Sequence, residues 1–500
     1  MRDITILNNT AVVLNDIPEL DYREFMDYNL AMMSDRPKRH CVLYFGCKND
    51  NNVRLFCCIA DDATHLIHVN SSVISPSAVL PSFTARNHNF EKFERELHEN
   101  FGISYSDHPW LKPLRYAYDR FDKHQTIENY PFCKSESEEL HEVGVGPIHA
   151  GIIEPGHFRF ICNGEQIMHL EIQFGYQHRG IEQLFLQKKK LLERTTLAED
   201  IAGDTTVGHT TAFVNLWESL CGCKPDFPLD YSRTLALELE RIAIHTGDLS
   251  GVCTDIGYQL GNAVLGRLRT PIINFMQEWS GSRFAKGLIR AGKTNFPFTG
   301  DLSGRLQDIL NAYEPDFDEI TDKLFHLPSA LSRMEKTGVV SYGQVLEIGT
   351  VGMAARMSGL NRDIRVSHPF CLYGSSIIHQ PIIKHHGDVY SRVQIRREEI
   401  KQSIDYVRKL IEYVPEFPKT EISTMTPGSD KFVLSLVEGW RGEICHCAIT
   451  DHAGNLVAYK IKDPSFHNWM ALAEAVKNNE ISDFPICNKS FNLSYCGQDL

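Results

Sequence analysis

The middle of the chain repeats its apolar residues with the period of an α-helix over six long stretches. These stretches are residues 180–192, 205–220, 232–247, 256–278, 303–323 and 395–413. Each can bury one apolar stripe against its neighbours. The body of the protein is therefore expected to be mainly α-helical, and a length of 500 residues predicts at least two domains.

Strand patterns flank this helical body. Before it, two alternating apolar runs meet at Asn163-Gly164, a dipeptide typical of a hairpin turn. After it come three strand-like runs and a last helix, at residues 431–436, 443–450, 456–462 and 468–476. The pattern predicts antiparallel sheet at the start of the large domain and again near its end.

Residues 1–122 predict a separate small α+β domain. Three strand-like runs, 41–45, 53–60 and 65–69, are followed by a helical stretch at 89–100. Residues 123–145 are polar and acidic without a sustained period, which is typical of a linker. The expected fold class is α+β, with the second domain at 146–500.

Composition excludes several classes of protein. Lys and Arg number 51 against 64 Asp and Glu, and the net charge of −13 argues against a nucleic-acid partner. No apolar run approaches the roughly 20 residues of a membrane helix, and the first residues lack a signal-peptide core. The 14 cysteines are scattered without a CxxC pair, so we expect reduced cytoplasmic thiols and no local metal motif.

Ordered motifs connect the chain to a known family. FERELHENFGISYSDHPWLKPLRY (residues 93–116) resembles the signature of the 30-kDa-type subunit of respiratory complex I. Six further motifs follow the order of the 49-kDa-type subunit and of the large subunit of membrane-bound nickel-iron hydrogenases, at residues 146–160, 175–185, 235–258, 355–365, 437–443 and 463–469. The fusion of both parts is similar to the large subunit of formate hydrogenlyase.

The resemblance to the hydrogenases implies a metal-binding pocket, but this chain lacks the cysteine ligands for it. Nickel-iron hydrogenases hold their metals with four cysteine thiolates, because a soft metal centre requires sulfur. Aligned on His209, the first ligand motif places Ala202 and Thr205 at two of these positions. The second places Ser494 and Gly497 at the others, with Cys496 out of register. We therefore expect no nickel-iron centre and no bound metal.

The resemblance to complex I implies a different ligand. There the pocket without thiolates receives a quinone headgroup, which a tyrosine and a histidine bind. Here Asp204 aligns with the tyrosine and His157 is shifted, so that pair is not reproduced. The expected lining is polar and acidic. From it we predict proton donors at Glu154, Asp204 and His209, and residues that bind the acceptor at His149, His157, Thr205 and Ser494.

A purely structural interpretation of the same residues stays open. Asp200 and Asp204 would cap the helix that begins near Thr205, and the histidines would bond to backbone in the core. Elsewhere, Arg356, Asp363 and Arg365 are expected to form a buried ion-pair network, and residues 187–190 a solvated helix face.

The resulting hypothesis is a hydrogenase-related oxidoreductase subunit of a complex I-like, ion-translocating assembly. It would bind no cofactor itself except a possible quinone, and would receive electrons from an iron-sulfur cluster in a small partner subunit. Antiporter-like membrane-arm subunits would complete a hetero-oligomeric complex on the cytoplasmic face of the inner membrane. The alternatives are a quinone-site subunit of the NADH-quinone oxidoreductase type and a non-catalytic coupling scaffold. The electron donor, acceptor and pumped ion have no signal in the sequence.

Overall fold

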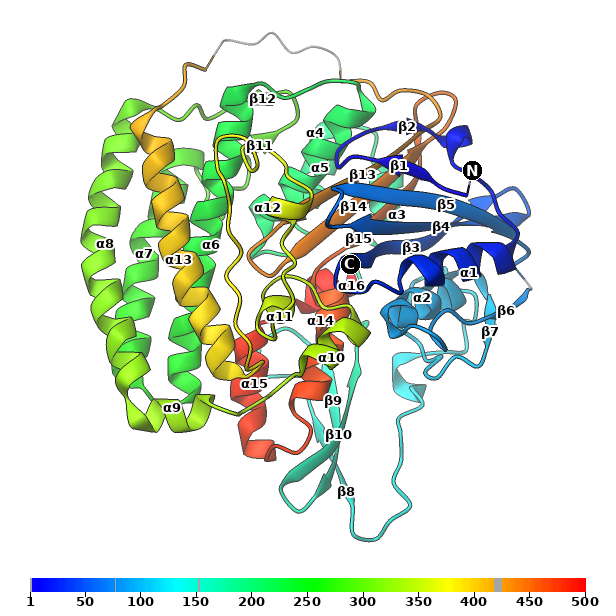
Figure 1. Cartoon of the computed structure of the whole chain (residues 1–500), viewed down its shortest axis with the longest axis horizontal. Coiled ribbons are helices and arrows are strands. Elements are labelled where there is room, and N and C mark those ends of the chain that lie inside the picture. The colour runs from blue at the N-terminus through cyan, green and yellow to red at the C-terminus, as the bar shows by residue number, and fades with distance from the viewer. Residues whose placement is uncertain (1, 77, 152, 418–424) are drawn as a thin grey trace.

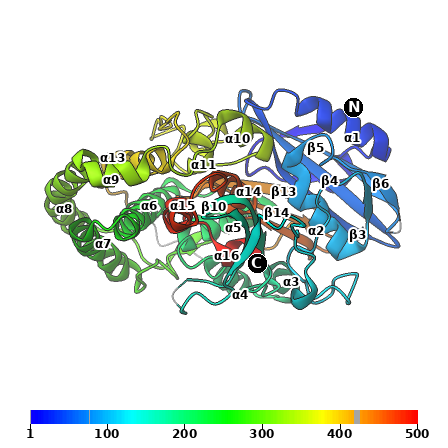
Figure 2. The same ribbon diagram turned by 90° about the horizontal axis from the view of Figure 1, so that it is seen from below.

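Four long helices pack together at one end of the molecule (Figures 1 and 2). They are α6 (Phe227–Asp255), α7 (Gln259–Ser280), α8 (Gly300–His326) and α13 (Val389–Glu412). In α8 the buried residues recur every three or four positions, as one apolar stripe requires. This computed structural model describes residues 2–76, 78–151, 153–417 and 425–500, and it confirms the helical body.

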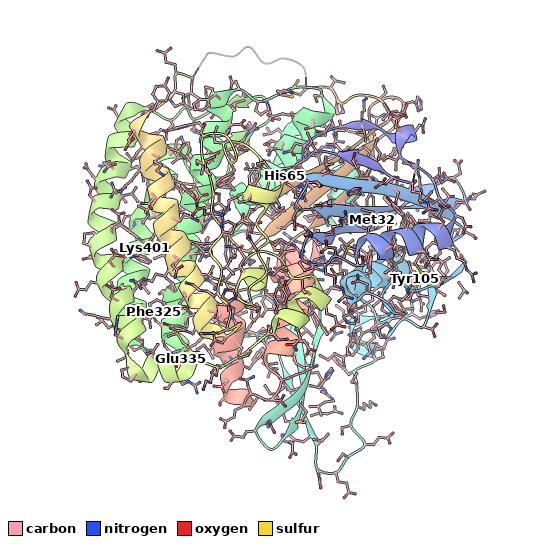
Figure 3. All side chains as sticks on the ribbon, in the orientation of Figure 1. Met32, His65, Tyr105, Phe325, Glu335 and Lys401 are labelled. Carbon is pink, nitrogen blue, oxygen red and sulfur yellow. The ribbon has the colours of Figure 1, made fainter. Side chains whose placement is uncertain are left out.

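The N-terminal part lies at the opposite end of the molecule. Its sheet has the strand order β1-β5-β4-β3 and is antiparallel throughout, with β1 (Ile4–Ile6), β3 (Arg39–Asn49), β4 (Asn52–Asp61) and β5 (Leu66–Ile74). Helices α1 (Tyr22–Met32) and α2 (Glu91–Phe101) accompany it. Figure 3 marks Met32 and Tyr105 on this side, and Phe325 and Lys401 on the helical bundle. The α+β prediction is confirmed.

A three-stranded sheet, β10-β9-β8, opens the large part. β9 (His157–Asn163) and β10 (Gln166–Gln173) form the predicted hairpin around Gly164. The third strand, β8 (His141–Val145), pairs with β9, although its residues were expected to belong to the linker. None of the five residues of β8 is buried, so the sequence shows no apolar alternation there that would predict a strand.

A second four-stranded sheet joins the two parts of the chain. Its order is β15-β14-β13-β2, with β13 (Lys431–Glu438), β14 (Glu443–Thr450) and β15 (Leu456–Lys462) close to the predicted runs. The edge strand β2 (Val12–Val13) comes from the N-terminal part. The Phe56 ring of β4 stacks on the Phe432 ring of β13 at 5.6 Å between centroids. The two parts therefore share sheet and core.

The predicted helix at residues 180–192 is wrong, because the structure divides it. Helix α3 (Ile181–Gln187) ends before three lysines, and α4 (Leu191–Glu199) begins after them. Lys188 and Lys190 have extended backbone, with ψ of 137° and 136°. The basic run is thus the break between two helices and not a helix face.

The remaining helices and strands are short, apart from α5, which is described with the site together with the short C-terminal helix α16. They are β6 (Val79–Pro81), β7 (Ser104–Ser106), β11 (Ile289–Arg290), β12 (Lys293–Thr294), α9 (Pro328–Met334), α10 (Tyr342–Ile348), α11 (Met353–Arg356), α12 (Ile364–Ser367), α14 (Ser465–Ala475) and α15 (Phe484–Phe491). Among the described residues, no helix is long and apolar enough to cross a membrane.

The predicted ion-pair network is confirmed between α6, α13 and residues 356–365, which run from the end of α11 into α12. Glu399 of α13 accepts hydrogen bonds from Arg356 at 2.7 Å, Arg365 at 3.1 Å and His245 at 2.7 Å. Arg365 also forms a two-pronged pair with Asp363. These side chains are all buried, so each charge depends on its partners.

A second buried ionic cluster lies between the N-terminal part and the central sheet. His40 of β3 contacts Glu443 of β14 at 2.6 Å and Asp62 at 3.4 Å. Burial and the Arg362 guanidinium lower the pKa of His40, but the two carboxylates together raise it above its usual 6.5. The imidazolium is therefore favoured where the two parts meet.

This cluster predicts a pH dependence of stability. Because the folded pKa of His40 exceeds the unfolded value, its stabilising contribution is complete below about pH 6.5 and is lost as the pH rises through the folded pKa. Urea titrations of the purified chain between pH 6 and 9 should show this decline, and His40→Gln should abolish that component. An equal slope in both proteins would contradict the assignment.

Candidate functional site

Three segments far apart in the sequence carry the predicted pocket. They are the turn between α4 and α5 (Thr206–Leu220), the turn between β13 and β14, and the start of α16 (Tyr495–Asp499). The first holds Ala202 and Thr205 and the third holds Ser494 and Gly497, the four positions at which the resemblance places thiolates. All four are buried.

Arg441, in the turn between the strands, ties the other two segments together. Its guanidinium donates to the two Asp204 carboxylate oxygens at 2.9 and 2.5 Å and to the Thr205 hydroxyl at 3.0 Å. Its Nε donates to the Asn492 carbonyl oxygen at 2.5 Å, two residues before Ser494. Burial opposes the charge, but the Asp204 carboxylate raises the pKa of Arg441. We call Asp204, Thr205 and Arg441 the clasp.

The expected cap of α5 is wrong. Thr205 is the N-cap residue but makes no capping bond, because its hydroxyl is part of the clasp. Asp204 bonds Arg441, and Asp200 forms an ion pair with Lys286. Instead, Glu240 of α6 accepts from the Val207 and Gly208 amides at 2.7 and 3.2 Å. Burial, with a contribution from Asp204, raises the pKa of Glu240 to about 8.

Glu154 reaches the start of α16. Its carboxylate accepts a hydrogen bond from the Cys496 amide at 3.2 Å. The Ser494 hydroxyl accepts from the Gly497 amide at 2.9 Å and lies 3.4 Å from the Cys496 sulfur. Burial, the Glu154 carboxylate and, more weakly, Asp204 raise the pKa of the Cys496 thiol to about 12. The carboxylates of Glu154 and of Asp204 in the clasp thus both raise the pKa of the Cys496 thiol.

His209 joins the site through Asp463. It is fully buried in α5, and its Nε2 lies 3.1 Å from an Asp463 carboxylate oxygen. A side chain at position 497 would begin only 2.7 Å from the Asp463 carboxyl carbon, so Asp463 lies directly behind Gly497. The structural interpretation, a bond from His209 to backbone, is wrong because both of its ring nitrogens contact side chains.

His149 and His157 close the loop that presents Glu154. Nε2 of His149 bonds the Gly156 carbonyl oxygen at 2.8 Å, and Nδ1 of His157 bonds the Gly146 carbonyl oxygen at 3.1 Å. For these two residues the interpretation as histidines bonded to backbone describes the contacts. Of the predicted residues, the structure therefore gathers Glu154, Asp204, Thr205, Ser494 and, through Asp463, His209, while these two histidines support the loop.

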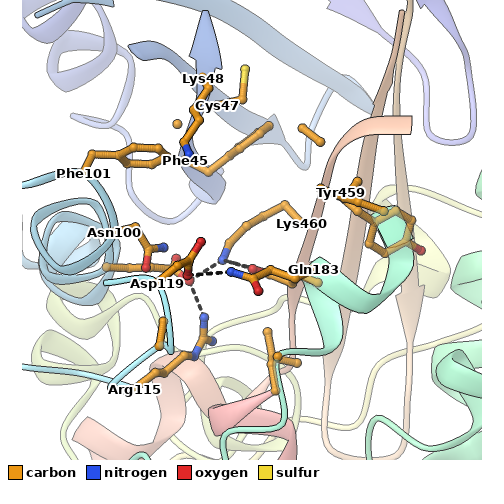
Figure 4. A pocket seen from close by; sticks show the side chains of 18 of the residues that line it. Phe45, Cys47, Lys48, Asn100, Phe101, Arg115, Asp119, Gln183, Tyr459 and Lys460 are labelled. Atoms are coloured by element: carbon orange, nitrogen blue, oxygen red, sulfur yellow. Dashed lines mark hydrogen bonds and ion pairs between the residues drawn. The ribbon is translucent and has the colours of Figure 1, made fainter. Parts of the chain in front are cut away.

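A cavity of about 480 Å³ lies between the N-terminal part and the large part (Figure 4). Its wall includes Phe45 and Phe101 from one part, and Glu182, Tyr459 and Lys460 from the other. Lys460 forms an ion pair with Glu182 at 2.9 Å and another with Glu96 of α2. The described residues of its wall include none of the predicted site residues, so this cavity is separate from the clasp.

Comparisons with known families agree with this organisation. Residues 7–137 match the 30 Kd subunit of the respiratory-chain NADH dehydrogenase, and residues 255–431 match its 49 Kd subunit. The chain thus joins, in one polypeptide, regions that match two complex I subunit types. Its relatives are oxidoreductase subunits of the NADH-quinone oxidoreductase and hydrogenase superfamily.

Relatives come from both branches of this superfamily. The chain is 26% identical to hydrogenase-4 component G and to formate hydrogenlyase subunit 5 of Escherichia coli, over 74% of its own length and 64% and 65% of theirs. It is 28% identical to a subunit of the NADH-quinone oxidoreductase of Dehalococcoides mccartyi, over 68% of this chain and 93% of that one. It thus spans less than two thirds of the two Escherichia coli relatives.

A solved structure has the same fold. One chain of the membrane-bound sulfane sulfur reductase, an archaeal respiratory membrane complex, superimposes with a TM-score of 0.66 at 19% identity. The match covers 73% of this chain and all of that one.

The residues at and beside the clasp can be compared with the ligands of the nickel-iron centre that the hydrogenase branch implies. Alanine and glycine have no ligating atom, the Thr205 hydroxyl bonds Arg441, and the Ser494 hydroxyl caps α16. Cys496 supplies a single thiol, one residue away from the implied ligand position, where four thiolates would be needed. The residues present therefore do not fit a four-thiolate nickel-iron centre.

One group of possible metal ligands occurs elsewhere among the described residues. Cys133, His169 and Glu171 lie near one another on the β8–β10 side. The Lys112 ammonium is 2.6 Å from the Glu171 carboxylate and 3.4 Å from the Cys133 sulfur. A side-chain cation thus already neutralises this group, and the group does not belong to the candidate site.

Sequence reasoning missed three important residues. It gave Arg441 no role in the site, although the ordered motif at residues 437–443 contains this arginine. Asp463 begins another of the ordered motifs, so both could have been found by asking what each motif contacts. Glu240 lies within a long helical period, where no local signal distinguishes a capping carboxylate from a solvated one.

Proposed function

We propose that the chain is the acceptor-reducing subunit of a complex I-like, ion-translocating oxidoreductase that works without a nickel-iron centre. Electrons pass from an iron-sulfur cluster of a small partner subunit to a small acceptor bound near the clasp. Protons come from this chain's own acids, with Glu154 and Asp204 as the nearest candidates. Two electrons and two protons then convert the acceptor to its dihydro form.

The observation that carries this proposal is the replacement of a thiolate cage by the clasp and its acidic neighbours. Asp204 and Glu154 raise the pKa of the half-buried Cys496 thiol, and the buried Glu240 behind the same turn has a raised pKa itself. Ionisable groups with perturbed pKa values that gather in one place are typical of sites that move protons.

The names of the relatives support the proposed assembly. Three relatives are named as subunits of larger enzymes. These enzymes are formate hydrogenlyase, the membrane-bound hydrogenase of Pyrococcus furiosus and NADH-quinone oxidoreductase. We infer that this chain likewise binds an iron-sulfur small subunit and antiporter-like membrane-arm subunits, as a peripheral subunit on the cytoplasmic face of the inner membrane.

Asp204→Asn is expected to slow acceptor reduction by about 100-fold, since a positioned proton donor contributes at least that factor. Asparagine keeps the shape and a carbonyl acceptor for Arg441 but cannot release a proton. Turnover and ion movement would be measured in the assembled complex. Asp200→Asn is the matched control, because Asp200 lies four residues earlier and forms a half-exposed pair with Lys286.

The assay also separates the alternatives. Reduced viologen would supply electrons, with protons, a short-chain quinone and sulfane sulfur offered as acceptors. Reduction of quinone alone would favour the quinone-site alternative, and an intact complex that reduces none of them would favour the scaffold. Unchanged turnover and ion movement in Asp204→Asn, or stoichiometric nickel by elemental analysis, would overturn the proposal.

A further inference from the structure

A chain of buried hydrogen bonds leads away from the candidate site through the central sheet. Asp463 contacts Nε2 of His209 at 3.1 Å, and Nδ1 of His209 lies 3.1 Å from Nε2 of His446. Nδ1 of His446 lies 2.8 Å from the Tyr459 hydroxyl. The four side chains come from α5, β14, β15 and the segment after β15, and none is more than 5% exposed.

The hydrogen-bonding capacity of these groups gives the chain one direction. Asp463 has a lowered pKa: burial opposes ionisation, but bonding to His209 and the Arg441 charge outweigh it, so it is an anion that only accepts. Burial and His209 lower the pKa of His446 well below its usual value, so that ring is neutral. A neutral imidazole has one donor and one acceptor nitrogen. With the His209 ring also neutral, Tyr459 donates to His446, His446 to His209, and His209 to Asp463.

Charged groups act on both ends of this chain. At the site end, Arg441 acts on Asp463 across the buried turn. At the other end, burial raises the pKa of Tyr459 well above its usual value, the Glu182 carboxylate adds to this, and the Arg194 guanidinium opposes it. Tyr459 thus keeps its proton, and the neighbouring thiols Cys445 and Cys447 have raised pKa values as well.

The two ends of the chain lie at different places in the molecule. Asp463 lies behind Gly497, at a vacated ligand position. Tyr459 and Glu182 both belong to the wall of the 480 Å³ cavity between the two parts of the chain (Figure 4). The hydrogen bonds therefore run unbroken from Tyr459, a wall residue of this cavity, to Asp463 at the candidate site.

We propose that Tyr459, His446, His209 and Asp463 form a proton relay that supplies the candidate site from the interdomain cavity. This inference rests on the proposed function. When a proton arrives at the Tyr459 oxygen, the hydroxyl proton moves to Nδ1 of His446. The Nε2 proton of His446 then moves to Nδ1 of His209, and the Nε2 proton of His209 moves to Asp463. Only O–H and N–H bonds form and break. Asp463 then passes the proton to the acceptor, whose electrons come from the iron-sulfur partner.

The test in the assembled complex is Tyr459→Phe, which removes one hydroxyl and keeps the ring that stacks on Phe185. Turnover should fall about 10-fold or more, and the solvent deuterium isotope effect should rise, because proton supply becomes limiting. Tyr313→Phe is the matched control: it also removes a buried hydroxyl, which bonds Thr246 in the helical bundle. His446→Gly should regain turnover when free imidazole is added.

If Tyr459→Phe showed the same turnover and the same isotope effect as Tyr313→Phe, the relay would be overturned. This holds whether or not the chain reduces an acceptor by another route. A readout without turnover is the nitrogen NMR spectrum of the histidine-labelled chain. The relay requires neutral rings protonated at Nε2 for His209 and His446. A proton on Nδ1 of either ring would overturn it, and an inert wild-type complex with the required tautomers would count against the proposed function alone.

Discussion

Replacing Glu399 with glutamine is expected to lower the free energy of unfolding by about 3 to 5 kcal/mol, the range for removing one partner from a buried ion pair. Glutamine keeps the volume but leaves Arg356 and Arg365 without the carboxylate that both share. The amide also presents donors toward groups that are themselves donors. Urea unfolding of the purified chain would measure the change.

The matched control is the same substitution one residue earlier. Glu398 has a 42% exposed side chain and pairs with Lys384 on the surface of α13. Glu398→Gln should change the free energy by less than about 1 kcal/mol. If both variants lost equal stability, the network would contribute no more than a surface pair.

Phe56→Ala is expected to cost about 3 to 5 kcal/mol of unfolding free energy, as for other fully buried aromatic side chains. Phe56 is fully buried between Phe45 of its own sheet and Phe432 of the central sheet. Its loss opens a cavity between the two parts of the chain, so we expect both to be destabilised together in a single unfolding transition.

Phe121→Ala is the control for this variant, because Phe121 is 66% exposed. It should leave the transition within about 0.5 kcal/mol of wild type. Hydrogen exchange would locate the effect: faster exchange confined to the N-terminal sheet in Phe56→Ala would mean that the two parts unfold independently.

Local patterns predicted two strands of the central sheet well because short apolar runs ended at turn residues. β14 and β15 match their predicted residues, and the turn-forming residues Gly454 and Asn455 lie between them. The break between α3 and α4 was missed because lysine is a good helix former and the run carries no breaker. In that case tertiary packing overrides local propensity.

The structure brings together part of the predicted set of residues. The motifs located Asp204, Thr205 and Ser494, yet the partner of Asp204 is 237 residues away, and no spacing rule connects them. His446 lies in a fully buried strand, where a histidine has no periodic signal. Predictions from one sequence identify candidate groups, whereas the bonds between them depend on how distant segments fold together.

The strand Val12–Val13 has a consequence for how the two subunit types can be joined. Because this N-terminal strand pairs with β13, and the Phe56 and His40 contacts cross the same boundary, the halves hold one another without the polypeptide between them. A proteolytic nick within 123–145 would leave them associated. Covalent fusion then adds only a high local concentration, and separate genes for the two halves could encode the same assembly.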